Sequence, residues 1–147
     1  MKRFNLEVVV GLFMLLGFAS FAYMSVKLGD VKIFNDKTYV VNARFGSVAG
    51  LKQGAAVDIA GVSVGKVASI KLNHETYEAM VVMHIQPDVK LQEDCIASIR
   101  TSGIIGDRYI SILPGGSFDL IADGGEIFET ESAINFEELL SKYIFEN

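Results

Sequence analysis

The feature that most limits the fold of this 147-residue chain is an uncharged run near its N-terminus. Val8 to Val26 reads VVVGLFMLLGFASFAYMSV, 19 residues without a charged side chain. A helix needs about 20 apolar residues to cross the hydrocarbon core of a bilayer, so the run predicts a transmembrane helix. Lys2 and Arg3 precede it on a short N-terminal segment. Short basic flanks stay in the cytoplasm, so in a bacterium we expect an inner-membrane anchor and a periplasmic body.

A cleaved signal peptide is the competing interpretation of the same run. Ser20-Phe21-Ala22 has the small-x-small pattern of a cleavage site, behind the basic Lys2-Arg3 pair. However, the run is longer than the roughly 7–15 residues of a signal core, and it continues past the candidate site to Val26. Its length favours a retained anchor within residues 1–30, whereas a mature chain beginning at Tyr23 would identify a signal peptide.

The charges of the chain are unevenly distributed. Residues 119–147 carry eight carboxylate side chains and one lysine, whereas the rest of the chain is slightly basic. No basic patch of the kind that binds nucleic acid is visible, so we expect no nucleic-acid partner. The single cysteine, Cys95, excludes an intrachain disulfide, and its CIASI context favours a small buried thiol.

After the apolar run, the hydrophobic pattern changes to a period of two residues. Most of the alternating runs are short and are bounded by Gly, Asn, Asp or Pro, which is typical of strands. The runs are 38–45, 57–60, 67–72, 77–85, 96–100 and 108–113. Several short strands at this spacing predict a mainly β fold, either a compact barrel or a sandwich.

A short amphipathic helix is predicted at the C-terminus. Asn135, with Glu138 three residues later, has the pattern of a helix cap. The apolar stripe that follows has helical spacing and consists of Phe136, Leu139, Leu140, Tyr143 and Ile144. Because isolated helices of about 11 residues are unstable, this helix needs a surface to pack on. The pattern leaves open whether that surface is its own barrel or copies of the same helix.

The polar residues give no pattern of a catalytic site. His74 lies in a predicted turn and His84 in an apolar strand, and neither has a partner at metal-ligand spacing. The glycine-containing run 61–66 lacks the spacing and the following helix of a phosphate-binding loop. We therefore expect a protein that is not an enzyme and that holds neither a metal nor a cofactor.

The segment RTSGIIGDRY, residues 100–109, has an unusual distribution of apolar side chains for a turn. Ile104 and Ile105 are adjacent and are flanked by Gly103 and Gly106, which would let the chain turn sharply. Most large apolar side chains are buried, so taken alone the pair would be expected to fold back into its own barrel as a plug. An exposed pair would instead mark an interaction site.

Two motifs resemble those of the MCE (mammalian cell entry) domain family of lipid-transport proteins. Residues 45–72 contain a GLKxGAxVxIxGVxVGxV run, and residues 98–116 resemble the family segment TxGLLGxxYxxLxPG. The resemblance covers about residues 38–117 and is strongest to the anchored single-MCE subunit of the Mla phospholipid transport system. It implies three parts: an anchor segment 1–30, a seven-stranded MCE β-barrel at 38–117, and an acidic connection with the helix at 118–147.

The resemblance also implies a function and partners. It implies a homohexameric ring with a hydrophobic central pore that passes phospholipid between the inner membrane and a soluble periplasmic carrier. An ABC permease and an ATPase would complete the complex. Ile104 and Ile105 would then form the pore tip with Gly103 and Gly106 as loop hinges, and the helix stripe would extend the pore. The alternative is an anchored structural or adhesive cell-surface module without transport activity.

Overall fold

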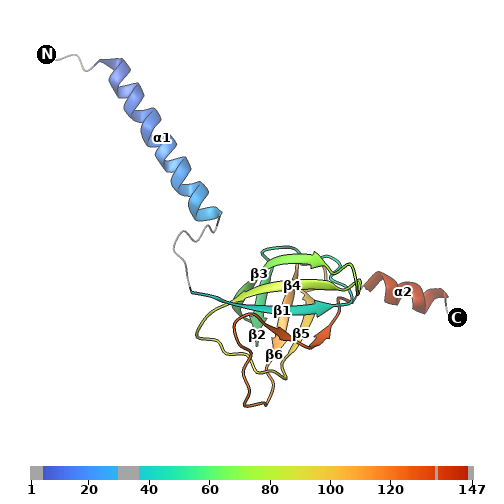
Figure 1. Cartoon of the computed structure of the whole chain (residues 1–147). Coiled ribbons are helices and arrows are strands. Elements are labelled where there is room, and N and C mark those ends of the chain that lie inside the picture. Colours follow the sequence, from blue (N-terminus) through green and yellow to red (C-terminus); the bar gives the residue numbers. More distant parts are fainter. Residues whose placement is uncertain (1–4, 30–36, 135, 146–147) are drawn as a thin grey trace. The chain divides into compact units, whose positions relative to one another are not determined.

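The computed structural model describes residues 5–29, 37–134 and 136–145, and the chain divides into two compact units, residues 1–36 and 37–147 (Figure 1). The first unit contains helix α1 (Leu6–Leu28), none of whose 23 residues is buried. At about 1.5 Å per residue, α1 is long enough to span a hydrocarbon core of about 30 Å. Within the described ranges, it is the one helix sufficiently long and apolar to cross a membrane.

The second unit is an eight-stranded sheet that curls around one core, followed by a short helix. The elements are β1 (Tyr39–Phe45), β2 (Ala56–Ile59), β3 (Val62–Leu72), β4 (Ala79–Ile85), β5 (Ile96–Thr101), β6 (Arg108–Leu113), β7 (Gly125–Ile127), β8 (Glu129–Glu131) and α2 (Phe136–Phe145). The strand order is β7-β1-β4-β3-β2-β6-β5-β8. The pairs β1–β7, β2–β6 and β5–β8 are parallel, and the other neighbours are antiparallel.

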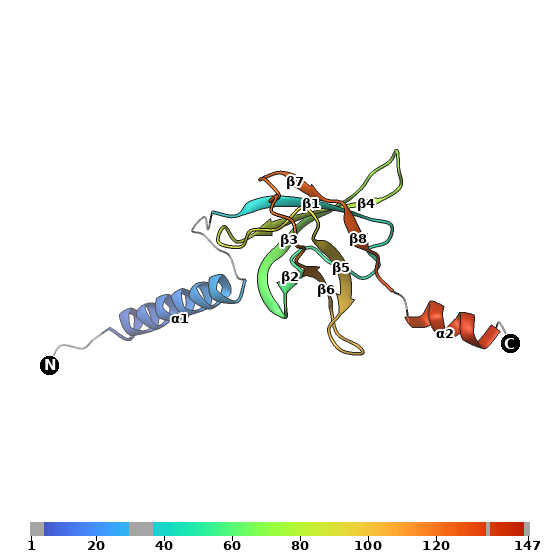
Figure 2. The ribbon, with the colours of Figure 1, turned by 90° about the horizontal axis from the view of Figure 1, so that it is seen from below.

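The sheet nearly closes into a barrel because one short segment belongs to both of its edges. β7 pairs with β1, and β8, which follows after the single residue Phe128, pairs with β5. Figure 2 shows β7 beside β1 and β8 beside β5. Residues 125–131 therefore cover both edge strands, whose backbone groups would otherwise be open to pairing with another chain.

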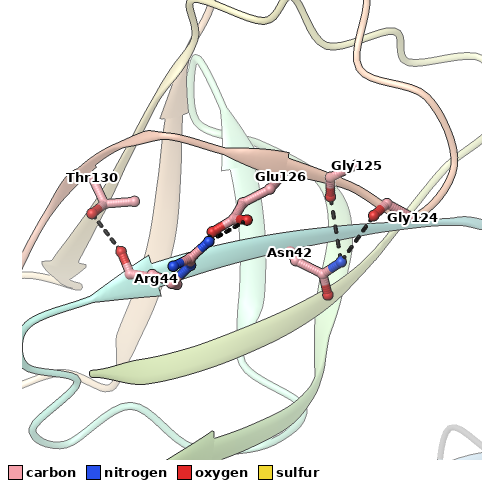
Figure 3. Close-up of polar contacts among 6 residues, drawn as sticks. All are labelled: Asn42, Arg44, Gly124, Gly125, Glu126 and Thr130. Atoms are coloured by element: carbon pink, nitrogen blue, oxygen red, sulfur yellow. Dashed lines mark hydrogen bonds and ion pairs between the residues drawn. The ribbon is translucent and has the colours of Figure 1, made fainter. Parts of the chain in front are cut away.

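Side chains of β1 hold this closing segment in place (Figure 3). Arg44 makes a double contact with Glu126, in which Nη2 donates to Oε2 at 2.9 Å and Nε donates to Oε1. The hydrogen bond from Arg44 lowers the pKa of Glu126. Thr130 Oγ1 donates to the carbonyl oxygen of Arg44 at 2.5 Å, and Asn42 Nδ2 donates to that of Gly124 at 3.1 Å. These contacts connect β1 to both halves of the closing segment.

The core follows from the two-residue alternation of the strands. In β1, Val41 and Phe45 are fully buried, and so are Val81 and Met83 in the neighbouring β4. Full burial of each such side chain contributes roughly 1.5–3 kcal/mol. Cys95 is also fully buried, as its sequence context predicts, and burial raises the pKa of its thiol to about 11.

We call the end of the barrel at which β1 begins the linker end. The register places Tyr39 of β1 opposite Ile85 of β4, and Ile96 of β5 opposite Leu113 of β6, at this end. The loops that follow β4 and β6 therefore lie here. They are connected to each other and to β1, because the Tyr39 hydroxyl donates to the carbonyl of Val89 at 2.6 Å and the Ile121 amide donates to that of Leu91.

We call the opposite end, from which the chain leaves toward α2, the helix end. Phe45 of β1 lies opposite Ala79 of β4, and Thr101 of β5 lies opposite Arg108 of β6. The segment 46–55, the turn 73–78 and the β5–β6 loop are therefore at this end. The segment 132–134, which leads to α2, lies at this end too, because the Ala133 amide donates to the Ser47 carbonyl.

The predicted β-barrel is confirmed, with two differences in detail. The sheet has eight strands where seven were expected, and it continues past residue 117, because β7 and β8 lie within the predicted acidic connection. Each of these strands has only three residues, too few for an alternating pattern to show. The predicted cap residue Asn135 lies outside the described residues.

Candidate functional site

The candidate site is the loop 102–107, which connects β5 to β6 at the helix end of the barrel (Figure 2). The Ser102 amide donates to the Asp107 carbonyl at 3.0 Å, so the two strands remain joined up to the base of the loop. Four residues lie between these two, and they form a compact turn. The strand pair thus presents a short tip whose position is set by the rigid barrel.

The two predicted hinge glycines have different structural reasons. Gly103 has φ +71°, a left-handed conformation that side-chain-bearing residues rarely adopt. The Cα of Gly106 lies against the backbone at the start of the turn, because a Cβ added there would be 1.8 Å from the carbonyl oxygen of Ser102. Both glycines therefore shape the tip, one through its backbone angle and the other through the close approach of two backbone segments.

The two isoleucines at the tip are almost fully exposed. Ile104 is 96% exposed and Ile105 is 95% exposed, so neither side chain packs into the core of its own barrel. The plug interpretation of this pair does not describe the structure. Two adjacent, fully solvated isoleucines are an apolar surface that needs a partner, because each loses roughly 1.5–3 kcal/mol by remaining in water.

Arg108, directly after the loop, connects its base to two other segments at the helix end. The guanidinium donates through Nη1 to the carbonyl of Ala49 and through Nη2 to the carbonyl of Ile134 at 3.3 Å. A Cβ on Gly50 would lie 3.1 Å from Arg108 Cδ, so this glycine leaves room for the arginine. One side chain therefore joins the loop base, the segment after β1 and the segment that leads to α2.

A pocket of about 600 Å³ with several charged residues in its walls opens beside the loop base. Its walls include Lys52, Asp58, Ser102, Asp107 and Arg108. Lys52 Nζ lies 3.6 Å from Asp107 Oδ1, but both side chains are largely exposed, so this ion pair contributes little stability. The tip is thus apolar and its surroundings are polar and charged.

The stripe of α2 is exposed in the single chain. Its described members are each more than half exposed: Leu139, Leu140, Tyr143 and Ile144. The side chain of Phe136, the fifth predicted member, lies outside what the structure describes, although α2 begins at this residue. An amphipathic helix of ten residues with an uncovered apolar face lacks the packing that normally stabilises short helices.

Sequence reasoning missed Arg108 and the exposed Phe118. Arg108 adjoins the loop in the sequence, but its acceptors are backbone carbonyls 59 and 26 residues away, which no local pattern indicates. Phe118, on the loop after β6 at the linker end, is fully exposed. Its signal in the sequence, an aromatic residue within PGGSFD, is weak.

The fold and the site define a class of protein: a small β-barrel that presents uncovered apolar groups at one end, suited to binding other molecules. The family model described as MlaD protein matches residues 37–115. The protein from Haemophilus influenzae named "Intermembrane phospholipid transport system binding protein MlaD" is 33% identical over 144 residues, covering 95% of this chain and 86% of that protein. The Escherichia coli protein of the same name is 32% identical over 146 residues, covering 95% and 80%.

A solved structure supports the same fold. A chain of the "Acinetobacter MlaFEDB complex in ATP-bound Vtrans1 conformation" matches with a TM-score of 0.75 and 22% identity, covering 97% of this chain and 100% of that chain. The chain belongs to the MlaD family, which confirms the MCE resemblance of its two motifs.

Proposed function

We propose that this chain is the binding subunit of an intermembrane phospholipid transport system. In this proposal, copies of the chain form a hexameric ring, and the loops 102–107 meet at its centre. Ile104 and Ile105 of every copy line the pore, and the stripes of the α2 helices extend the apolar path. The observation that carries the proposal is the pair of almost fully exposed isoleucines on a glycine-shaped tip.

An apolar path is needed because the exposure of acyl chains to water has a large free-energy cost. Each methylene of an acyl chain that enters water costs about 0.8 kcal/mol, so two acyl chains cannot cross an aqueous compartment without apolar cover. A collar of paired isoleucines would offer that cover without contacts specific to a head group. The rigid barrel would hold each tip in place, because the loop base is closed by the Ser102–Asp107 hydrogen bond.

The remaining parts of the chain have matching roles in this proposal. α1 is the single inner-membrane anchor, with a cytoplasmic N-terminus and the barrel in the periplasm. The partners are an ABC permease, an ATPase and a soluble periplasmic lipid carrier that exchanges phospholipid with the ring. The similarity to proteins named as binding proteins of intermembrane phospholipid transport systems supports this assignment.

The test replaces the tip while leaving the barrel intact. The double variant Ile104→Asn with Ile105→Asn should fold and form the ring, because neither side chain contacts the core. It should lose transfer of fluorescent phospholipid between membrane vesicles and the carrier. Native mass spectrometry of the full chain in detergent measures the subunit number and the bound lipid of the same samples.

A matched control comes from the other end of the barrel. Phe118→Asn removes an equally exposed apolar side chain from the linker end, and it should leave lipid transfer unchanged. Normal transfer by the isoleucine double variant would refute the pore role. A wild-type chain that carries no phospholipid and captures neither a permease nor an ATPase would support the structural or adhesive alternative.

A further inference from the structure

The outer surface of the barrel has one acidic side, formed by β2, β6, β5 and β8. The strand registers place Asp58, Ser111, Ser98 and Glu131 next to one another in a continuous row across these strands. Glu129 lies two residues before Glu131 in β8 and therefore points to the same side. The exposed Arg100, two residues after Ser98 in β5, points there too, so the carboxylates of Asp58, Glu129 and Glu131 outnumber one guanidinium. We call this surface the acidic face.

Two polar groups of the acidic face differ in their hydrogen bonding. Ser98 is only 5% exposed, and its hydroxyl donates to Glu131 Oε2 at 2.5 Å, which fixes this carboxylate on the surface. Among the described residues, the buried Asp58 Oδ1 has no hydrogen-bond partner. A buried carboxylate oxygen without a donor is costly, so this face lacks a donor in the single chain.

The outer surface of β3, β4 and β1 has the opposite charge. Lys66 lies beside His84 in the register, and Lys71 lies in a row that continues through β4 to Arg44 of β1. The two lysines, His84 and Arg44 are all exposed, and Arg44 is paired with Glu126 of β7. We call this surface the basic face.

The centres of the two faces lie on different sides of the barrel, although the faces adjoin where β3 of the basic face pairs with β2 of the acidic face. In the strand order, β4 at the centre of the basic face is separated from β6 of the acidic face by β3 and β2. In the other direction, β7 lies between β1 of the basic face and β8 of the acidic face. A copy of the chain thus carries complementary charges on two surfaces whose centres face different directions.

Each face also carries apolar side chains, and the acidic face has a small cavity. Leu113, 63% exposed, lies on the acidic face beside a cavity of about 230 Å³ that Ser98, Ser111 and Glu131 also line. Met80 and Val82 point outward from β4 at the centre of the basic face, and both are partly buried. This combination of apolar centre and charged surroundings is typical of a protein interface.

We infer that the acidic face of one copy contacts the basic face of the next copy. This inference rests on the proposed ring and specifies its interface. Contacts between two different surfaces of identical subunits close into a ring when the rotation between neighbours allows it. Complementary charges would set the register of that contact and disfavour contact between two like faces.

The test exchanges the charges on one face at a time. The first variant carries Glu129→Lys and Glu131→Lys, so both of its faces are positive. The second carries Lys66→Glu and Lys71→Glu, so both of its faces are negative. Native mass spectrometry of each full-length variant in detergent should show monomers, whereas the wild type should form hexamers. An equimolar mixture of the two variants should form hexamers with equal numbers of each.

Each outcome has a distinct meaning. A second variant that assembles alone as well as the wild type would show that the basic face is not an interface. Two folded variants that stay monomeric when mixed would show that the faces do not bind each other. A wild-type chain that forms no ring would instead refute the proposed ring itself.

Folding is checked by the far-ultraviolet circular dichroism of each variant. Glu131→Lys could unfold the barrel, because Ser98 loses its hydrogen-bond acceptor. In that case the first variant is made as Glu129→Lys with Glu131→Gln, since the amide oxygen of glutamine still accepts this hydrogen bond. The expected results for this variant and its mixture are the same.

Discussion

The two glycines of the apolar loop allow a paired test of how the tip is built. Gly106→Ala would place a Cβ 1.8 Å from the Ser102 carbonyl oxygen, whereas real Cβ contacts essentially never fall below 3.0 Å. The loop must therefore open, and the Ser102–Asp107 hydrogen bond is lost. Gly103→Ala meets no atom within 4 Å and is strained only through its φ of +71°.

The expected losses in the free energy of unfolding follow from the close backbone contact at residue 106 and from the left-handed conformation at residue 103. For Gly106→Ala, the lost hydrogen bond costs roughly 1 kcal/mol and the distorted backbone a similar amount, about 2 kcal/mol together. For Gly103→Ala, a left-handed strain of about 1–2 kcal/mol is partly offset by the lower entropy of the unfolded chain, about 0.4–1 kcal/mol. In a domain of this size, each 1 kcal/mol lowers Tm by roughly 4–8 °C.

Thermal unfolding of the full chain in detergent, followed by circular dichroism, measures both variants. Gly106→Ala should lower Tm by about 8–16 °C, clearly more than Gly103→Ala. Gly103→Asn should be milder than Gly103→Ala, because asparagine tolerates the left-handed conformation better. If the Tm of Gly106→Ala equals that of the wild type, or exceeds that of Gly103→Ala, the argument from close backbone approach is refuted.

Two further predictions concern the contacts around the barrel ends. Arg108→Ala should release the segment that leads to α2, because the guanidinium donates to the Ile134 carbonyl; hydrogen exchange of the amides in residues 132–134 should accelerate, while exchange in β4 should not change. Arg108→Lys should restore this protection only in part, because an ammonium cannot reproduce the two hydrogen bonds that the guanidinium donates to Ala49 and Ile134. Asp94 accepts hydrogen bonds from the Gly116 and Ser117 amides, which lower its pKa in the folded state. Its contribution to stability is therefore present above the unfolded pKa of about 3.9 and is lost as the pH falls through the lower folded pKa. Asp94→Asn should accordingly lower Tm at neutral pH, and its difference from the wild type should shrink below about pH 4; a difference that is independent of pH would contradict the assignment.

The strands that sequence patterns identify are those with one buried side. In β1 and β4, buried residues alternate with less buried ones over the last five positions, and both strands fall within alternating runs of the sequence. β7 and β8 were not visible, because three-residue strands rich in glycine and glutamate have no pattern of their own. Their pairing is imposed by the open edges of β1 and β5, which only the assembled sheet creates.

The candidate site was predictable in composition and not in orientation. The motif placed Ile104 and Ile105 between glycines, but the sequence alone could not decide between burial and exposure. The exposure follows from where the hairpin ends, because the β5–β6 pairing continues to Thr101 and Arg108 and carries the tip beyond the core. The contacts of Arg108 depend on segments brought together by the fold, so they lie beyond any local pattern.

The arrangement of the linker end and the helix end has a mechanical consequence. Consider a pull applied to β1 at Tyr39, directed along the axis of this strand. All seven residues of β1 are paired with β4, and the hydrogen bonds of this antiparallel ladder are perpendicular to such a force. They would bear the load together in shear instead of opening one after another. The barrel should thus resist tension along its length and carry displacement from one end to the other with little stretch.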